Sequence, residues 1–207
     1  MEIRTALNLA KRIQAISQTG LTYCKESFDI DRYEELQQIS HELIHLLTGV
    51  EPKKIANFFM NEKEYPTPKT DVRAVIFNEQ HEILLVREKS DNRWALPGGW
   101  ADIGLSPREV VVKEVREETG LIAVPRKLLA LLDKKLHPHT PEIDYAYKLF
   151  IECSVTGGEL GGAHDIVDVA YFAKDNIPPL SEIRVVPSQI SLMFEFHENP
   201  DKEVVFD

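Results

Sequence analysis

The chain has 207 residues, of which 43% are hydrophobic and 28% are charged, and its formal net charge at pH 7 is −10. This composition is typical of a globular protein with one medium domain and a small one. It argues against a large nucleic-acid surface, which needs clustered Lys and Arg, and no apolar run approaches the ~20 residues of a membrane span.

Two runs of apolar residues at helical spacing make residues 1–64 look helical. We expect Asp29 or Asp31 to cap the second helix, and Gly49 to end it shortly before Pro52. The apolar positions are Ala6, Leu9, Ile13 and Ile16 in the first run, and Leu36, Ile39, Leu43, Leu46 and Val50 in the second.

The segment from Glu64 to Pro68 reads as a stiff extended linker, because a residue that precedes proline is pushed out of the helical region. We place a domain boundary there. It separates a helical N-terminal domain, residues 1–64, from a larger domain, residues 68–207.

Beyond the linker the pattern changes to that of strands separated by turns. A turn is expected at residues 78–81, and a closing helix at residues 188–197. The expected strands cover residues 72–77, 82–88, 128–136, 145–156 and 166–172.

Between these strands, residues 107–119 are expected to form one helix. Ser106 and Glu109 have the spacing of a capping box, Pro107 suits the first helical position, and Gly120 suits the C-terminal stop. The β-branched run Val110-Val111-Val112 favours a strand, but the cap and the stop outweigh it.

Three carboxylates lie on one face of this predicted helix. At about 100° per residue, Glu114, Glu117 and Glu118 fall within an arc of roughly 100°. Carboxylate oxygens suit Mg²⁺ or Mn²⁺. An ordinary solvated acidic face is the alternative, and the Gly98-Gly99 turn just before the helix favours a cation site, because glycine lets the backbone approach a metal–phosphate cluster.

The stretch GWADIGLSPREVVVKEVREETGL, residues 99–121, resembles the Nudix box: Gly, five residues, Glu, seven residues, then Arg-Glu-apolar-any-Glu-Glu-any-Gly-apolar. Two positions depart from this pattern, since Leu105 replaces the first Glu and Lys113 replaces the Arg. The flanks PTPKTDVRAVIF and DIVDVAYFAKDNIPPLS are similar to those of bacterial Nudix hydrolases with an N-terminal helical domain. The matching positions are Gly99, Glu114, Val115, Glu117, Glu118, Gly120 and Leu121.

The resemblance implies an α/β fold, the Nudix α/β/α sandwich with a mixed sheet. It implies metal-dependent hydrolysis of a nucleoside diphosphate linked to another group, in a subgroup described as ADP-ribose or CDP-choline pyrophosphatases. Gly99, Glu114, Glu117 and Glu118 would hold Mg²⁺ or Mn²⁺, and Glu117 would act in catalysis.

The departures in the box leave the general base open. Leu105 cannot accept a proton, and Lys113 lacks the bidentate geometry of Arg. Either the box works alone, or a base comes from the glycine-rich loop at residues 157–162 and its surroundings, where resembling enzymes often place one. Asp165 is the first candidate and Glu159 the second, and His164 lies in the same segment.

Other polar and aromatic residues have two readings each. Arg87, Lys148 and Arg184 would hold phosphates or remain solvated charges. Trp100 would stack on a base or, like Trp94, pack in the core. The segment His137-Pro138-His139 is either a plain turn or a substrate-contacting loop.

Residues 1–64 admit further hypotheses. His41-Glu42-Leu43-Ile44-His45 matches the zinc-protease motif HExxH, but no third ligand has a recognisable spacing. A ligand sensor is another alternative, in which a DNA-binding helical domain is fused to a ligand-binding Nudix fold that has lost catalysis. It is disfavoured, because this segment is not basic and the Glu triplet is intact. Homodimerisation is the remaining role, because two amphipathic helices cannot bury all their apolar surface alone.

The cysteines and the N-terminus bear on localisation. Cys24 and Cys153 provide no disulfide framework and are read as reduced packing residues. The N-terminus also lacks the apolar core of a signal peptide. A cytoplasmic protein is therefore expected.

Overall fold

The computed structural model describes residues 3–60, 65–161 and 165–207. The chain divides into two compact units: residues 1–68 with 141–145, and residues 69–140 with 146–207. The sequence pattern did not indicate that residues 141–145 belong with the helices. Within the described parts, no helix is long and apolar enough to cross a membrane.

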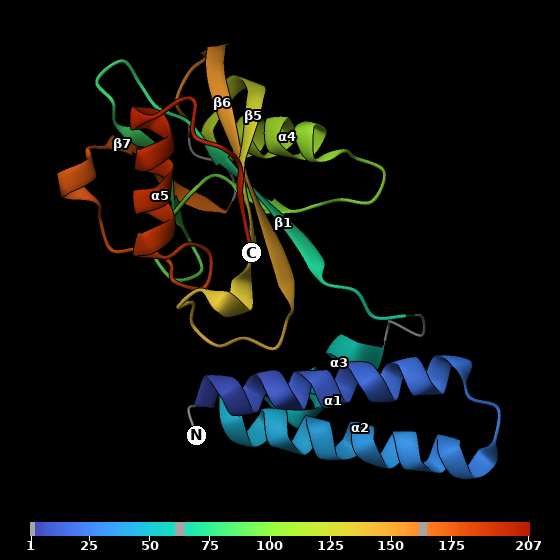
Figure 1. Cartoon of the computed structure of the whole chain (residues 1–207). Coiled ribbons are helices and arrows are strands. Elements are labelled where there is room, and N and C mark those ends of the chain that lie inside the picture. Colours follow the sequence, from blue (N-terminus) through green and yellow to red (C-terminus); the bar gives the residue numbers. More distant parts are fainter. Residues whose placement is uncertain (1–2, 61–64, 162–164) are drawn as a thin grey trace. The chain divides into compact units, whose positions relative to one another are not determined.

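The first unit is built from three helices: α1 (Ile3–Tyr23), α2 (Ser27–Thr48) and α3 (Pro52–Met60) (Figure 1). Helices α1 and α2 lie side by side, and α3 starts at a proline, which the first helical turn tolerates. Their shared core is small and consists of Leu7, Ala10, Ile44 and Ile55, with Ile143 packed against it.

The start of α2 differs from the expected one. The helix begins at Ser27, so Asp29 lies in its first turn and Asp31 lies within it, and the N-cap is Glu26 without a side-chain cap. An acidic residue in the first turn still interacts favourably with the helix dipole, which explains why Asp29 is compatible with this position. The predicted end is confirmed, because Gly49 adopts a left-handed conformation (φ 71°) and donates to the carbonyl of His45.

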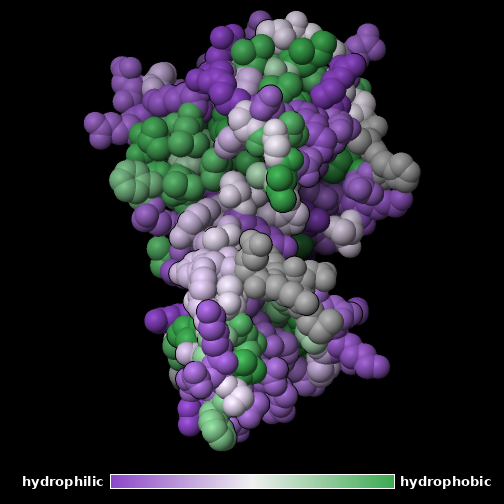
Figure 2. Space-filling model, turned by 90° about the vertical axis from the view of Figure 1, so that its right-hand side faces the viewer, coloured by the Kyte–Doolittle hydropathy of each residue, from purple (hydrophilic) through white to green (hydrophobic). Residues whose placement is uncertain are grey.

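Many of the apolar residues that made this unit look helical are on its outside. The buried face of α1 carries Leu7 and Ala10, and also the polar residues Gln14 and Ser17. Figure 2 shows hydrophobic side chains exposed among hydrophilic ones on the helices. The exposed large hydrophobic residues of α1 and α2 include Leu9, Ile16, Tyr23, Phe28, Leu36, Ile39, Leu43 and Leu46.

The second unit contains two sheets. Strands β4, β1, β6, β5 and β8 form one sheet in that order, and β3, β2 and β7 form the other. The larger sheet is mixed, since β1–β6 and β5–β8 are parallel while β1–β4 and β5–β6 are antiparallel. The strands are β1 (Lys69–Val75), β2 (Ile83–Glu88), β3 (Trp94–Ala95), β4 (Gly98–Trp100), β5 (Leu121–Asp133), β6 (Ala146–Gly158), β7 (Ile166–Phe172) and β8 (Val205–Phe206).

Two helices cover the strands of this unit on opposite sides (Figure 1). Helix α4 (Pro107–Thr119) buries Val110, Val111 and Val115 in one core, and α5 (Pro187–Glu198) contributes to the other. The valine run therefore serves packing, which overrides its preference for strands. The predicted α/β sandwich with a mixed sheet is confirmed, as are both helices to within one residue.

Strand lengths differ more from expectation. Strand β5 begins at Leu121 rather than at residue 128, and residues Lys134–Leu136 form a 3₁₀ turn instead of its end. Pro125 is tolerated within β5 because the pairing register shifts next to it, where a missing N–H costs little. The sequence analysis missed β3, β4 and β8, because strands of two or three residues are too short to show a period.

The segment His137-Pro138-His139 has a structural role at its second histidine. His139 is 4% exposed, and its Nδ1 lies 2.8 Å from the backbone carbonyl oxygen of Glu182. Its Nε2 lies 3.0 Å from the side-chain amide nitrogen of Gln189. A neutral ring that donates through Nδ1 and accepts from Gln189 satisfies both contacts. Burial accordingly lowers the pKa of His139 to about 4.

This histidine is expected to make stability depend on pH. Its pKa in the folded state lies below its unfolded value of 6.5, so the unfolded chain binds the proton more readily and stability falls as pH drops from 6.5 towards 4. Integrated over that range, the loss approaches about 3 kcal/mol. Chemical denaturation of the wild type and of His139→Gln at pH 7 and pH 5 measures this contribution, because the wild type should lose about 2 kcal/mol more than the variant between these pH values. Groups whose pKa shifts act in the opposite direction, such as Glu118, contribute equally to both proteins. An unchanged difference in His139→Gln would assign the effect to other groups.

Candidate active site

The site is built on α4, and local interactions fix both ends of that helix. The Ser106 side chain accepts from the backbone N–H of Glu109, while the Glu109 carboxylate accepts from the backbone N–H of Ser106, which forms the predicted capping box. Gly120 closes the helix in a left-handed conformation (φ 75°). With the valines turned into the core, the rotation of α4 about its axis is set, and the glutamates take the remaining face.

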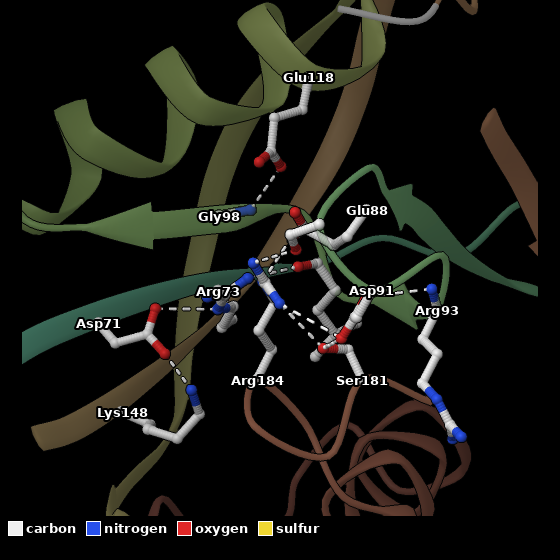
Figure 3. Close-up of polar contacts among 12 residues, drawn as sticks. Asp71, Arg73, Glu88, Asp91, Arg93, Gly98, Glu118, Lys148, Ser181 and Arg184 are labelled. Carbon is white, nitrogen blue, oxygen red and sulfur yellow. Dashed lines mark hydrogen bonds and ion pairs between the residues drawn. The ribbon is translucent and has the colours of Figure 1, made fainter. Parts of the chain in front are cut away.

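The three glutamates differ strongly in burial. The side chain of Glu117 is 59% exposed and that of Glu114 is 16% exposed. Glu118 reaches deepest, and its Oε2 accepts a hydrogen bond of 2.8 Å from the backbone N–H of Gly98 (Figure 3). Burial raises the pKa of Glu118 to about 8, although Arg73 and the Gly98 N–H act in the opposite direction. Burial also raises the pKa of Glu114.

The two glycines of β4 let this strand approach its neighbours closely. Gly98 has a φ of +138°, and a Cβ atom there would lie 2.0 Å from the carbonyl oxygen of Val72. At Gly99 a Cβ atom would lie 3.2 Å from Oε2 of Glu114. Strand β4 therefore passes directly beside the carboxylates, and Gly98 in particular has no room for a side chain.

The donor chemistry of this face fits a hard divalent cation. The side-chain atoms on this face that could coordinate a metal are all carboxylate oxygens, the ligands that Mg²⁺ and Mn²⁺ prefer. Burial makes the charge of Glu118 costly, and a bound cation would offset that cost. In residues 3–60, 65–161 and 165–207, no three His, Cys, Asp or Glu side chains are already gathered as a metal site.

Lys113 has a carboxylate partner that the sequence analysis did not identify. Its ammonium group lies 2.8 Å from Asp102, 3.7 Å from Glu114 and 3.6 Å from Glu117. Leu105, where the family pattern has Glu, offers no such group. Asp102 thus supplies a carboxylate partner for Lys113, three residues before position 105, where the family pattern has Glu.

The two candidate bases lie at different places. Glu159 lines a pocket with Glu117, Arg116 and glycines 120, 158 and 161. Asp165 is exposed, and its carbonyl oxygen accepts a 2.9 Å hydrogen bond from the backbone N–H of Lys89, just after β2. Its negative charge contributes to the raised pKa of Glu88, after the larger effect of burial. His164 lies outside the described residues.

The expected substrate contacts separate into exposed and buried groups. Trp100 is 49% exposed, and the Lys69 ammonium lies 5.7 Å from its ring centre. Arg87 forms a 3.1 Å ion pair with Asp168 and lies over the ring of Trp94. The prediction for Lys148 was wrong, because its side chain is 1% exposed and is salt-bridged to Asp71, so it cannot reach a phosphate.

Arg184 also takes part in internal contacts rather than facing outward as a solvated charge. Its Nε lies 2.8 Å from Glu88, and its Nη1 donates to Ser181 (Figure 3). Its Nη2 donates to the hydroxyl of Ser90 at 3.1 Å. Ser181 in turn donates to Asp91 at 2.6 Å. These contacts join the end of β2 to the segment before α5.

The sequence analysis missed Asp71 and Arg73, which lie on β1 beneath the carboxylates. Both are buried, and the Arg73 Nε lies 2.9 Å from the Asp71 carboxylate. A signal was present, since two opposite charges two residues apart share one face of a strand in which they alternate with apolar residues. Such a pair in a buried strand indicates an internal ion pair.

The HExxH motif has ordinary structural contacts. The His41 ring stacks on Phe59 with ring centres 5.7 Å apart, and Nδ1 of His45 lies 2.8 Å from the carbonyl oxygen of Val50. His45 therefore helps to fix the turn after α2. The part of the chain that the structure describes provides no third ligand for these histidines.

Two family models match the chain. Residues 4–59 match a domain described as a UDP-X-like N-terminal oligomerisation domain, and residues 67–193 match the NUDIX domain. A Bacillus subtilis (strain 168) protein named "Putative ADP-ribose pyrophosphatase YjhB" is 46% identical over 201 residues, which are 97% of this chain and 96% of that protein. An ADP-ribose pyrophosphatase of Methanocaldococcus jannaschii is 31% identical over 120 residues, 56% of this chain and 69% of that protein.

Solved structures are similar over the same regions. A UDP-X diphosphatase aligns with a TM-score of 0.64 and 32% identity, over 100% of both chains. An ADP-ribose pyrophosphatase from Streptococcus suis 89-1591 aligns with a TM-score of 0.61 and 40% identity, over 68% of this chain and 100% of its own.

Proposed function

The chain belongs to the Nudix family of hydrolases, and from this we propose that it hydrolyses the pyrophosphate bond of a nucleoside diphosphate linked to another group. The observation that carries the proposal is the carboxylate face of α4. Glu118 accepts from the Gly98 N–H at 2.8 Å, and Glu114 and Glu117, on the same helix, lie 3.7 Å and 3.6 Å from the Lys113 ammonium group. Water adds to one phosphorus as the bridging P–O bond breaks, which yields a nucleoside monophosphate and a second phosphorylated product.

The residues of the site have distinct proposed roles. Glu114, Glu117, Glu118 and the backbone of Gly99 would hold Mg²⁺ or Mn²⁺, which neutralises phosphate charge and lowers the pKa of a bound water. The Gly98 N–H orients the Glu118 carboxylate. Lys113, paired with Asp102, lies within 3.7 Å of both Glu114 and Glu117 and restrains their carboxylates.

The substrate class follows from the relatives' names and remains a proposal. ADP-ribose and UDP-linked compounds come first, and CDP-choline is the alternative from the subgroup resemblance. The exposed ring of Trp100 is proposed to stack on the base, and Arg87 to contact a phosphate. The two cysteines are free, which fits the proposed cytoplasmic location.

A substrate panel tests the proposal. ADP-ribose, a UDP-sugar and CDP-choline are each incubated with the full chain and Mg²⁺ or Mn²⁺, and both products are identified. We expect a nucleoside monophosphate in every productive reaction and no turnover when EDTA removes the cation. Release of inorganic pyrophosphate from nucleoside triphosphates alone would contradict the proposal. Tight binding without any turnover would favour the ligand-sensor alternative.

The helical unit is proposed to hold a homodimer. Its exposed hydrophobic residues, such as Leu46 at 77%, and the oligomerisation domain matched by residues 4–59 support this role. Substituting Leu46→Lys should shift the mass measured by light scattering from dimer towards monomer at micromolar concentration. The control is Leu136→Lys, an exposed leucine of the other unit. A monomeric full-length protein would refute the proposal.

A loop carboxylate is proposed as the general base. Glu159 shares a pocket with Glu117, and Asp165 lies beside the end of β2. Loss of the base should lower kcat by about 100-fold and remove the acidic limb of the pH–rate profile. Glu159→Gln and Asp165→Asn are compared with the exposed control Glu79→Gln. If both variants keep full turnover and an unchanged acidic limb, the box carboxylates act without a loop base.

A further inference from the structure

Lys148 and Asp71 form an ion pair inside the larger sheet. They are register partners on the parallel strands β6 and β1, and their side chains are only 1% and 7% exposed. Burial lowers the pKa of Lys148 to about 8, although Asp71 acts in the opposite direction. Removing two charges from water is costly, so a buried pair of this kind calls for an explanation beyond stability.

Arg73 extends this pair towards the active site. Its Nε lies 2.9 Å from the Asp71 carboxylate, and its Nη1 donates to the carbonyl of Leu96 at 3.0 Å. Two cations share the single carboxylate of Asp71, so the set carries one uncompensated positive charge. Asp71, Glu118 and Glu88 all attract the Arg73 guanidinium. Glu88 is already paired with Arg184, so Glu118 is the remaining carboxyl group near Arg73, and the positive charge of Arg73 favours its ionised form.

The Leu96 contact connects Arg73 to Glu118 through the backbone. Leu96 lies two residues before Gly98, whose N–H binds the Glu118 carboxylate at 2.8 Å. Arg73 and Gly98 are also register partners in the antiparallel pair β1–β4. In Figure 3 the contacts run from Lys148 through Asp71 to Arg73, which lies beneath the Gly98–Glu118 bond.

We propose that Lys148, Asp71 and Arg73 form a buried tether that holds the Leu96–Gly98 turn and thereby positions the Glu118 carboxylate for a divalent cation. The inference rests on the proposed function, since it assigns Glu118 to cation binding. The three tether residues are positioning residues that touch neither substrate nor cation. Lys148 therefore affects the reaction from inside the sheet, through Asp71 and Arg73.

The test compares Lys148→Met with Lys127→Met. Both changes remove an ammonium group of the second unit, but Lys127 bonds the carbonyls of Pro200 and Lys202, away from the tether. The concentration of free Mn²⁺ is measured by electron paramagnetic resonance, which gives the Mn²⁺ affinity of each variant. The stability of each variant is measured by denaturation, and its kcat and KM by steady-state kinetics. We expect Lys148→Met to bind Mn²⁺ about 10-fold more weakly, a loss of 1.4 kcal/mol, and to lose kcat with little change in KM.

Lys127→Met should retain wild-type Mn²⁺ affinity even if it loses stability. Arg73→Lys is the second variant: it keeps the charge but loses the fork that joins Asp71 to Leu96, and it should show the same weakened binding. If Lys148→Met fails to fold, Arg73→Lys decides alone. Wild-type affinity in a folded tether variant overturns the inference. If the wild type itself binds no Mn²⁺ and hydrolyses nothing, the proposed function fails instead.

Discussion

Glu118→Gln is expected to lower turnover by about 100- to 1000-fold and, in the cation-free protein, to raise stability at pH 7. The amide keeps the shape and can still accept from the Gly98 N–H, but it cannot supply a charged ligand. Burial raises the pKa of Glu118 from 4.5 to about 8, so the folded state holds a proton that the unfolded chain has lost at pH 7. That difference opposes folding by as much as about 3 kcal/mol, and Gln removes it.

The sign of the stability change separates a cation ligand from a packing residue. The gain should be present above pH 4.5 and should disappear as pH falls below that unfolded value. Glu117→Gln is the matched control: its side chain is 59% exposed, so it should lose turnover without a comparable stability gain. Denaturation curves with and without Mn²⁺ complete the measurement. Near wild-type turnover in purified Glu118→Gln would refute its role.

Gly98→Ala is expected to destabilise the second unit by about 3 kcal/mol and to lower turnover by more than 10-fold. A Cβ atom there would lie 2.0 Å from the carbonyl of Val72, and the φ of +138° is unfavourable for alanine. Relief of this clash requires β4 to move away from β1, which displaces the N–H that holds Glu118.

Gly104→Ala separates the steric clash expected in Gly98→Ala from the conformational cost of a positive φ. Gly104 also has a positive φ, +94°, but a Cβ atom there would have nothing within 4 Å. It should therefore show only the conformational cost, about 1 kcal/mol. Urea denaturation of both variants gives the comparison. Equal losses at the two positions would contradict the steric argument.

Local sequence signals determined the framework of the active site. Ser106, Glu109 and Gly120 specify where α4 begins and ends, because their interactions reach only a few residues along the chain. The spacing of Glu114, Glu117 and Glu118 then places their carboxylates on one face. Strands β2 and β7 were found for the same reason, since each is long enough to show its own apolar pattern.

Contacts between distant segments were decided only by the tertiary structure. The pairing of Asp102 with Lys113 depends on how the loop before α4 folds back. The exposed position of Leu46 and the buried position of Lys148 depend on which elements pack against their own. A side chain's residue type gives its chemistry but not its surroundings.

The site itself shows this division most clearly. The sequence determined that three carboxylates share one helical face next to a glycine turn. The tertiary structure decided that Glu118 bonds to Gly98 and that Arg73, Asp71 and Lys148 lie beneath them, on strands β1 and β6 far away in the chain. Helical periodicity and capping are local interactions, whereas the burial and pairing of a charge depend on strands that meet only when the sheet forms.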